Sequence, residues 1–230
     1  MDSLQRTIHL TEDGSHTIAL SDKRLTYHSI HGAIGESRYV FIETGLQPVL
    51  KKSGGLPINI LEMGFGTGLN ALLTLKEAIR KEIPVYYEGI ELHPLVPSET
   101  AGLNYTHQLG DISTDAEFYL LHAARWNEHV PLHPFFTLHK RQVSMTEAEY
   151  EQRFHLIYYD AFAPKDQPEL WTRDIFEKLH RNLHPGGILV TFCSKGAVRR
   201  AMLAAGFRVE KLPGPPGKRE ILRATRPATA

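Results

Sequence analysis

From residue 58 onward, short apolar runs alternate along the chain with longer amphipathic stretches. This alternation is typical of a mainly parallel sheet whose strands are joined by covering helices. The last two runs flank a short segment rich in Pro and Gly, which favours an antiparallel hairpin over a helical crossover. We therefore expect an α/β fold with a seven-stranded sheet that is mostly parallel and ends in a C-terminal hairpin. The predicted strands are residues 58–63, 85–90, 135–138, 154–159, 188–193, 207–212 and 220–225.

Apolar positions spaced three or four residues apart predict the covering helices. Two such stripes lie at residues 69–79 and 170–183, and a further helix is expected at 115–126. Before residue 57 the pattern changes to polar alternation followed by an apolar run, which predicts a small hairpin and a helix. We interpret residues 1–56 as a cap on a catalytic domain formed by residues 57–230.

Overall composition restricts the function only weakly. The chain has 230 residues, enough for one α/β domain with small additions, and its 26 Lys and Arg balance its 26 Asp and Glu. The distribution is uneven, because nine Lys and Arg against two Glu lie between residues 195 and 230. Such an excess can form a face for an anionic ligand, although a solvated basic tail is the alternative.

The single cysteine, Cys193, lies in an apolar run, which leaves no disulfide framework and no cysteine metal site. The histidines are scattered without ligand spacing, so we expect no metal. The N-terminus lacks the apolar core of a signal peptide, and no apolar stretch approaches the roughly 20 residues of a membrane span. We therefore expect a cytoplasmic protein without a membrane partner.

Three alternate glycines, Gly64, Gly66 and Gly68, follow the strand at 58–63. They let the chain turn sharply and let a ligand approach bare backbone at the start of a helix, whereas an ordinary strand-to-helix turn is the alternative. Glu91 ends the next strand, near the spacing of about 20 residues expected for an acid that binds ribose hydroxyls. Glu62 favours S-adenosyl-L-methionine over a nicotinamide cofactor, because a carboxylate there can position the cationic methionine end.

A second candidate segment begins where the fourth predicted strand ends, at Asp160. Residues beyond the carboxyl ends of parallel strands face the ligand crevice, so Asp160 is predicted to face the reacting groups, unless it is a turn residue or helix N-cap. Phe162 and Pro164 can wall a flat ring. Lys165 and Trp171 could reach a phosphate or stack on a nucleobase, although Trp171 could equally pack in the core.

These segments resemble the methyltransferase domain of the MnmC family, including its stand-alone form, MnmD. The glycine loop is shared by class I methyltransferases in general, whereas Asp-Ala-Phe-Ala-Pro at 160–164 and Gly-Lys-Arg-Glu at 217–220 are specific to the MnmC family. The stretch 35–42 and Pro-Gly-Gly at 185–187 also match, so the resemblance spans nearly the whole chain. It implies a class I methyltransferase (Rossmann-like) fold.

The resemblance also implies an activity: methylation of the exocyclic amine of 5-aminomethyl-(2-thio)uridine at the tRNA wobble position, with S-adenosyl-L-methionine as donor. Only a neutral amine has the lone pair for this attack, so Asp160 is the candidate to orient the amine and accept its proton. Fused members of the family carry a flavin-dependent oxidase domain for which this chain has no room. We therefore expect no flavin and no obligate protein partner, and an acceptor tRNA that already carries the aminomethyl group.

Further site residues are predicted from the resemblance and from the positive charge of the C-terminal part of the chain. Tyr27 and Arg38 are expected to close over the cofactor. Where the family often has Gly-Asp to bind the adenine amine, this chain has Arg141 and Gln142, and Gln142 could still offer an acceptor. The candidates for binding tRNA phosphates are Arg199, Arg200, Lys218 and Arg219.

Three other functions are compatible with the same patterns. A dinucleotide-dependent oxidoreductase could use the same glycines and acid, and it would bind NAD. A methyltransferase could act on a different amine, such as a small molecule. A non-catalytic RNA-binding protein could retain a decayed methyltransferase fold, although the glycines, Glu91 and Asp160 argue against decay.

Overall fold

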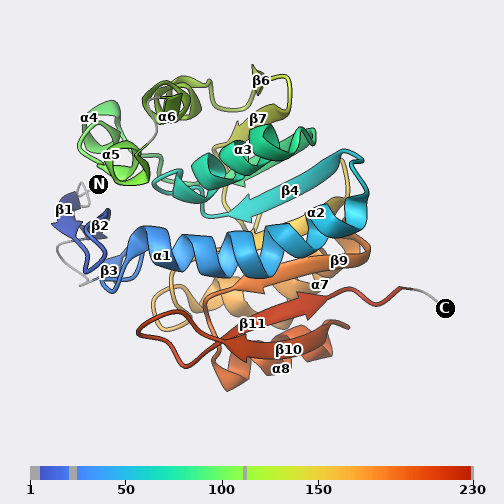
Figure 1. Cartoon of the computed structure of the whole chain (residues 1–230). Coiled ribbons are helices and arrows are strands. Elements are labelled where there is room, and N and C mark those ends of the chain that lie inside the picture. Colours follow the sequence, from blue (N-terminus) through green and yellow to red (C-terminus); the bar gives the residue numbers. More distant parts are fainter. Residues whose placement is uncertain (1–5, 21–24, 111–112, 229–230) are drawn as a thin grey trace.

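The computed structural model describes residues 6–20, 25–110 and 113–228. Its centre is a sheet with the strand order β10-β11-β9-β8-β4-β5-β7-β6 (Figure 1). Strands β9, β8, β4, β5 and β7 pair in parallel, and β11 pairs antiparallel with both β9 and β10. The bounds are β4 (Ile58–Met63), β5 (Val85–Ile90), β6 (His129–His133), β7 (Phe136–Arg141), β8 (Phe154–Tyr159), β9 (Leu183–Thr191), β10 (Arg208–Pro213) and β11 (Glu220–Thr225). The mostly parallel α/β fold with a C-terminal hairpin is confirmed.

The prediction of seven strands in this sheet was wrong by one, because β6 adds an eighth as the antiparallel edge partner of β7. Its residues are exposed or half-buried, and the register of its pairing with β7 shifts between Pro131 and His133. An edge strand of this kind buries no continuous apolar face, so no apolar run marks it in the sequence. Strand β9 also begins earlier than predicted, at Leu183 rather than residue 188.

Helices cover both faces of the sheet (Figure 1). One face carries α3 (Leu69–Lys81) and a continuous helix made of α1 (Ala33–Ser37), the π-helical η1 (Arg38–Leu46) and α2 (Gln47–Ser53). A Cβ on Gly45 would lie 2.9 Å from Val190 Cγ2, so the glycine lets the long helix approach β9 closely. The other face carries α7 (Arg173–Asn182) and α8 (Gly196–Ala204). The two apolar cores that result hold the strand ends in fixed positions.

The predicted helix at 115–126 corresponds to α6 (Ser113–Ala123), which follows the short helices α4 (Pro97–Thr100) and α5 (Tyr105–Leu109). The helix predicted at 170–183 is divided into the 3₁₀ turn η2 (Pro168–Trp171) and α7. Thr172 separates them, because its backbone is extended and its side chain accepts a hydrogen bond from the Ile175 N–H as a helix N-cap.

The N-terminal hairpin predicted around residues 16–20 and 25–27 is present as β2 (His16–Leu20) and β3 (Leu25–Thr26), and β1 (Arg6–Leu10), which was not predicted, adds a third antiparallel strand. The long helix of residues 33–53 shares one apolar core with α3 and the main sheet. The division into a cap and a catalytic domain at residue 56 stays a prediction. None of the helices in the described part of the chain has both the length and the apolar character that crossing a membrane would need.

Candidate active site

A pocket lies beyond the carboxyl ends of β4, β5, β7 and β8, where the topology of a parallel α/β sheet places its ligand crevice. Four connections after these strands contribute to its lining, and the segment after β3 closes another side. The lining residues used below lie at 27–28, 64–67, 69–70, 91–93, 144–146 and 160–162, with Gln167 from the loop that follows.

The glycine loop between β4 and α3 forms the floor of the pocket. Gly64, Gly66 and Gly68 all have positive φ angles, of 97°, 48° and 73°. A Cβ on Gly64 would lie 2.7 Å from the carbonyl oxygen of Asp160, and one on Gly66 would lie 2.9 Å from the ring of Tyr27. The loop therefore needs glycine both for its backbone conformation and for the close approach of its neighbours.

Glu91, directly after β5, lines the pocket and is fixed by two backbone donors. Its Oε2 accepts a hydrogen bond from the Gly66 N–H at 3.1 Å, and its Oε1 accepts one from the His93 N–H at 2.9 Å. Each oxygen retains a further acceptor site for a ligand hydroxyl. The structure thus brings Glu91 and the glycine loop together, as the spacing in the sequence predicts.

Two carboxylates meet through one amide at the bottom of the pocket. Asn70 Nδ2 donates to Glu62 Oε1 and to Asp160 Oδ2, each at 2.9 Å. Glu62 is fully buried, and burial raises its pKa well above the usual range, with Asp160 and Glu91 adding to the effect. Glu62 therefore lies beneath the pocket rather than in its lining, where it holds Asn70.

Of the two carboxylates that Asn70 joins, Asp160 is the one that lines the pocket. Burial raises its pKa to about 7, the nearby Glu36 adds to the increase, and the Asn70 hydrogen bond and the Lys218 charge oppose it. A carboxylate with this pKa can exchange protons near neutral pH. The position and the pKa together are those expected of a general base.

Lys218, from the turn between β10 and β11, reaches back to the long helix. Its Nζ forms an ion pair with Glu36 Oε1 and lies 4.1 Å from the centroid of the Phe192 ring. Glu36 Oε2 accepts a second hydrogen bond from the Ser29 N–H at 2.9 Å. Lys218 is therefore engaged within the protein, beside the site, rather than free to bind a phosphate.

Two aromatic rings form one wall of the pocket. Tyr27 and Phe162 lie edge to face with ring centroids 5.3 Å apart. Burial raises the pKa of the Tyr27 hydroxyl to about 12, with the Glu91 charge as a further cause. The Phe162 backbone is held on both sides, because its N–H donates to Gln167 Oε1 at 3.1 Å and its carbonyl accepts from Trp171 Nε1 at 2.8 Å.

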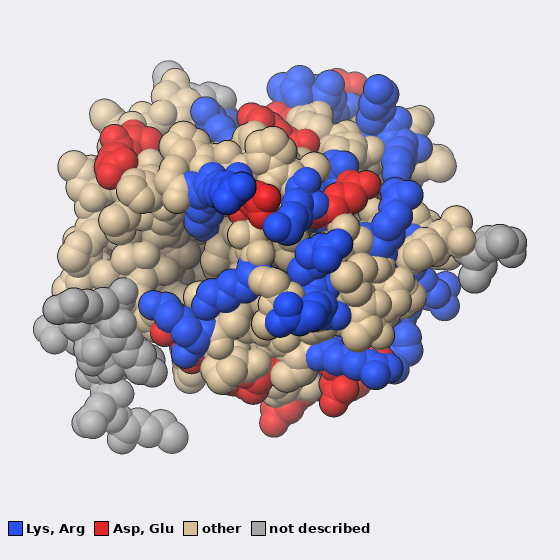
Figure 2. Space-filling model, turned by 90° about the horizontal axis from the view of Figure 1, so that it is seen from below, with Lys and Arg blue, Asp and Glu red and all other residues tan. Residues whose placement is uncertain are grey.

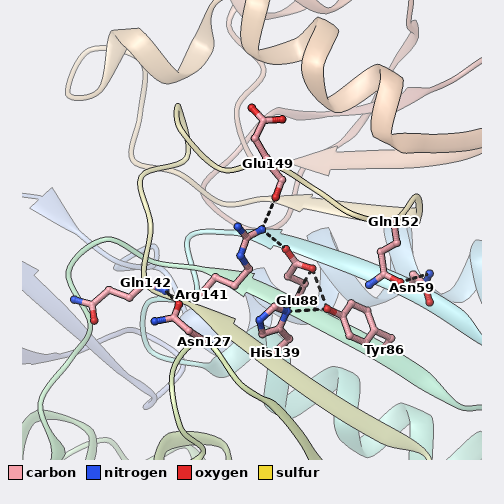
Figure 3. Close-up of polar contacts among 9 residues, drawn as sticks. All are labelled: Asn59, Tyr86, Glu88, Asn127, His139, Arg141, Gln142, Glu149 and Gln152. Atoms are coloured by element: carbon pink, nitrogen blue, oxygen red, sulfur yellow. Dashed lines mark hydrogen bonds and ion pairs between the residues drawn. The ribbon is translucent and has the colours of Figure 1, made fainter.

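The other predicted site residues all lie outside the lining of this pocket, including the C-terminal Arg199, Arg200 and Arg219. Trp171 is 6% exposed and packs edge to face on Tyr159, so it supports the Phe162 loop from the core. Pro164 and the exposed Lys165 lie further along that loop. Arg38 lines a separate cavity with Lys76, Glu77 and Glu117. Gln142 is exposed, and in Figure 3 its side chain points away from Arg141 and Glu88.

Several lining residues were not predicted from the sequence. Asn70 is the clearest case, since an amide among the apolar residues of the first turn of α3 is a signal that could have marked it. Ser144, Met145 and Thr146 follow the end of β7, so the sheet topology alone could have placed them at the crevice. The ring nitrogen Nε2 of His28 forms a hydrogen bond with Thr67 Oγ1 at 2.7 Å, and no sequence pattern indicates this contact.

Comparisons with known proteins agree with this geometry. Residues 128–227 match a family model described as S-adenosyl-L-methionine-dependent methyltransferase. The chain is similar to the tRNA 5-methylaminomethyl-2-thiouridine biosynthesis bifunctional protein MnmC of Aeromonas salmonicida, with 32% identity over 90% of this chain and 33% of that protein. The MnmC of Aromatoleum aromaticum is 31% identical over 93% of this chain and 34% of its own length. The chain thus spans about a third of these curated relatives.

Solved structures agree as well. The crystal structure of MnmC2 from Aquifex aeolicus superposes with a TM-score of 0.80 and 25% identity, covering 100% of this chain and 73% of the other. Spermidine synthase from Thermotoga maritima superposes with a TM-score of 0.59 at 15% identity, covering 100% of this chain and 72% of the other, which reflects the shared fold alone.

Proposed function

We propose, because residues 128–227 match a model of S-adenosyl-L-methionine-dependent methyltransferases and the chain is similar to the MnmC proteins, that it is a methyltransferase of this kind and methylates the amine of 5-aminomethyl-(2-thio)uridine at the tRNA wobble position. The product would be 5-methylaminomethyl-(2-thio)uridine. The observation that carries the proposal is the position of Asp160, half-buried at the pocket beside the glycine loop, with its pKa raised to about 7.

The residues present fit S-adenosyl-L-methionine. Gly64 and Gly66 leave a surface without Cβ atoms at the start of α3, and Glu91 has acceptor sites for ribose hydroxyls. Tyr27 lies over Gly66 and would cover the bound group. When bound, the cofactor supplies a methyl group on a positively charged sulfur, which a nucleophile can take without further activation.

The protein's own task is to present the acceptor amine in its neutral form. Asp160 would accept a hydrogen bond from this amine, orient it and take its proton, because a pKa near 7 makes this carboxylate a stronger base than an ordinary Asp. Its Oδ2 is held by Asn70, so Oδ1 remains for the amine. Productive transfer would need the amine about 3 to 3.5 Å from the methyl group.

A basic face supports an RNA acceptor. Figure 2 shows Lys and Arg side chains gathered on the side of the molecule that carries β10, β11 and α8. Several of these cations are engaged within the protein, such as Lys211 with Glu220 and Arg223 with Glu210. Within the described residues, the cations of this C-terminal part that have neither an ion pair nor a hydrogen bond to a carboxylate or carbonyl are Lys195, Arg199, Arg200 and Arg219. These side chains are available for phosphates.

The test uses two anticodon stem-loops that differ at one base. Labelled S-adenosyl-L-methionine is incubated with the protein and a stem-loop that carries 5-aminomethyluridine at the wobble position, or one with unmodified uridine there. Label should enter only the first. Cofactor binding without transfer to either RNA would leave a methyltransferase of another acceptor, and absence of cofactor binding would contradict the proposal altogether.

A further inference from the structure

The loop between β7 and β8 carries one side of the cofactor pocket. Its residues Ser144, Met145 and Thr146 line the pocket, and Met145 Cε lies 3.5 Å from the position that a Cβ on Gly64 would take. The loop forms a local turn in which the N–H groups of Glu147 and Ala148 both donate to the Ser144 carbonyl, at 3.0 and 2.9 Å. This turn keeps the three lining residues together but does not by itself fix their distance from the sheet.

Arg141, the last residue of β7, connects the two ends of this loop. Its Nη1 lies 2.9 Å from Glu88 Oε1, in the middle of β5, and 2.6 Å from the carbonyl oxygen of Glu149, at the far end of the loop (Figure 3). One guanidinium nitrogen therefore joins the sheet to the returning chain. Charged hydrogen bonds of this kind are both strong and directional.

The anchor on the sheet side is rigid. The Glu88 side chain is 5% exposed, and its Oε2 accepts a further hydrogen bond from the Tyr86 hydroxyl at 3.0 Å. Tyr86 in turn lies 2.9 Å from His139 Nδ1 on the neighbouring strand. Because Glu88 is buried and held from two sides, the position of Arg141 is set by the sheet rather than by the loop.

We propose that Arg141 is a positioning residue for the cofactor pocket: by bridging Glu88 and the Glu149 carbonyl, it holds residues 142–149 where Ser144, Met145 and Thr146 can close on the bound nucleoside. The inference rests on the proposed use of S-adenosyl-L-methionine, and it is independent of the acceptor. A second tie, from Lys178 Nζ to Glu149 Oε1 at 2.9 Å and to the Thr146 carbonyl at 3.4 Å, restrains the outer side of the same loop.

The experiment measures the dissociation constant of S-adenosyl-L-methionine by calorimetry, with the melting temperature recorded for each variant. Arg141→Lys keeps a charge beside Glu88, but its shorter side chain ends before the position of Nη1, from which both contacts are made. A double variant, Arg141→Met with Glu88→Gln, removes the bridge without leaving a buried unpaired carboxylate. Both should bind the cofactor roughly tenfold more weakly, the loss expected for a charged hydrogen bond, while kcat at saturating cofactor changes little.

The matched control is Arg80→Lys, which alters another Arg–Glu ion pair, that of Arg80 with Glu77 on α3, outside the lining of this pocket. It should leave cofactor affinity within about twofold, since the bridge between Glu88 and the Glu149 carbonyl is intact. Wild-type affinity in Arg141→Lys, or an equal loss of affinity in Arg80→Lys, would overturn the inference. Failure of the wild-type protein to bind S-adenosyl-L-methionine would instead overturn the proposed function.

Discussion

Asn70 donates a hydrogen bond from Nδ2 to Asp160 Oδ2 at 2.9 Å, across 90 residues of sequence. The same nitrogen donates to the fully buried Glu62 at 2.9 Å, so one amide links the end of β4 to the end of β8. This contact favours the charged form of Asp160 and so limits the rise in its pKa caused by burial. The basicity of the proposed general base is therefore set partly by a residue of α3.

Replacing Asn70 with Ala should raise the pKa of Asp160 further above its usual range. Because a general base works in its deprotonated form, activity should then require a higher pH. We expect the rising limb of the pH profile of kcat to move to higher pH by roughly one pH unit. The measurement is kcat for methyl transfer at saturating cofactor and RNA across pH 5.5 to 9.5, values chosen about two units either side of a general base near neutrality.

Thr74→Val is the matched control, one helical turn further along α3. Thr74 is also buried, and its hydroxyl bonds the Asn70 carbonyl and the Tyr158 hydroxyl rather than either carboxylate. Its pH profile should coincide with that of the wild type. A profile of Asn70→Ala that does not move would argue against Asp160 as the base.

Gly66→Ala should impair cofactor binding through sterics. A Cβ on Gly66 would lie 2.9 Å from the Tyr27 ring, in a loop residue with φ of 48°. Gly54 also has a positive φ, of 60°, but a Cβ there would meet nothing within 4 Å. We expect Gly54→Ala to cost only about 1 kcal/mol of unfolding free energy, whereas Gly66→Ala should also weaken S-adenosyl-L-methionine binding by at least about tenfold. If calorimetry gave the two variants equal affinities for S-adenosyl-L-methionine, the proposal that the glycine loop binds this cofactor would be contradicted.

Two histidines beside the glycine loop, the buried His28 and the half-buried His122, should make stability depend on pH. Burial lowers the pKa of His28 and of His122 to about 4, and both rings contact Thr67 in the glycine loop. The unfolded chain binds protons at these rings below about pH 6.5, whereas the folded chain does not until about pH 4. Each histidine therefore destabilises the fold progressively as pH falls through this window, by up to about 2 kcal/mol between pH 7 and 5.

The check is urea unfolding of His28→Gln and His122→Gln at pH 7 and at pH 5. Each variant should lose less stability than the wild type over this interval. Comparison with the wild type is needed because Glu62 and Asp160, whose pKa values are raised in the folded state, contribute a slope of the opposite sign. His107→Gln, on an exposed position of α5, should reproduce the wild-type change. Wild-type behaviour in both buried-site variants would disprove this explanation.

The basic face should carry the salt dependence of RNA binding. Arg200→Gln combined with Arg219→Gln removes two exposed cations on α8 and next to β11. The KM for the RNA should rise, and the slope of log affinity against log salt should fall by about 0.7 to 0.9 for each phosphate that the variant no longer neutralises. Arg125→Gln serves as the control, because this residue is 79% exposed and follows the end of α6, which Figure 1 shows far from α8. An unchanged slope in the double variant would place the RNA elsewhere.

Most strands of the central sheet could be predicted from the sequence, because strands buried on both faces are largely apolar, as β4 and β8 are. The positions of Gly64, Gly66, Glu91 and Asp160 at the pocket could also be predicted. Each follows a strand of the parallel sheet, and the carboxyl ends of these strands lie together at one edge of the sheet. The half-exposed edge strand β6 lacked an apolar run and was missed.

Side-chain partnerships between distant parts of the chain could not be predicted in this way. The ion pair of Lys218 with Glu36 joins residues 182 positions apart, and nothing in either local pattern indicates it. Arg141 stands out in the sequence only as a departure from the related family, whereas the structure gives it two partners, Glu88 and the Glu149 carbonyl. Periodicity reports which face of an element is buried, but the identity of the residue it meets depends on the packed structure.

The central claim is that this chain transfers a methyl group to the aminomethyl group of the wobble uridine with Asp160 as the base. The most direct measurement is mass analysis of nucleosides from tRNA that carries 5-aminomethyl-2-thiouridine, after incubation with S-adenosyl-L-methionine and either the wild-type protein or Asp160→Asn. We predict conversion to 5-methylaminomethyl-2-thiouridine by the wild type and a rate at least about 10²-fold lower for the variant. No methylated nucleoside with the wild type, or an equal rate with Asp160→Asn, would contradict the account.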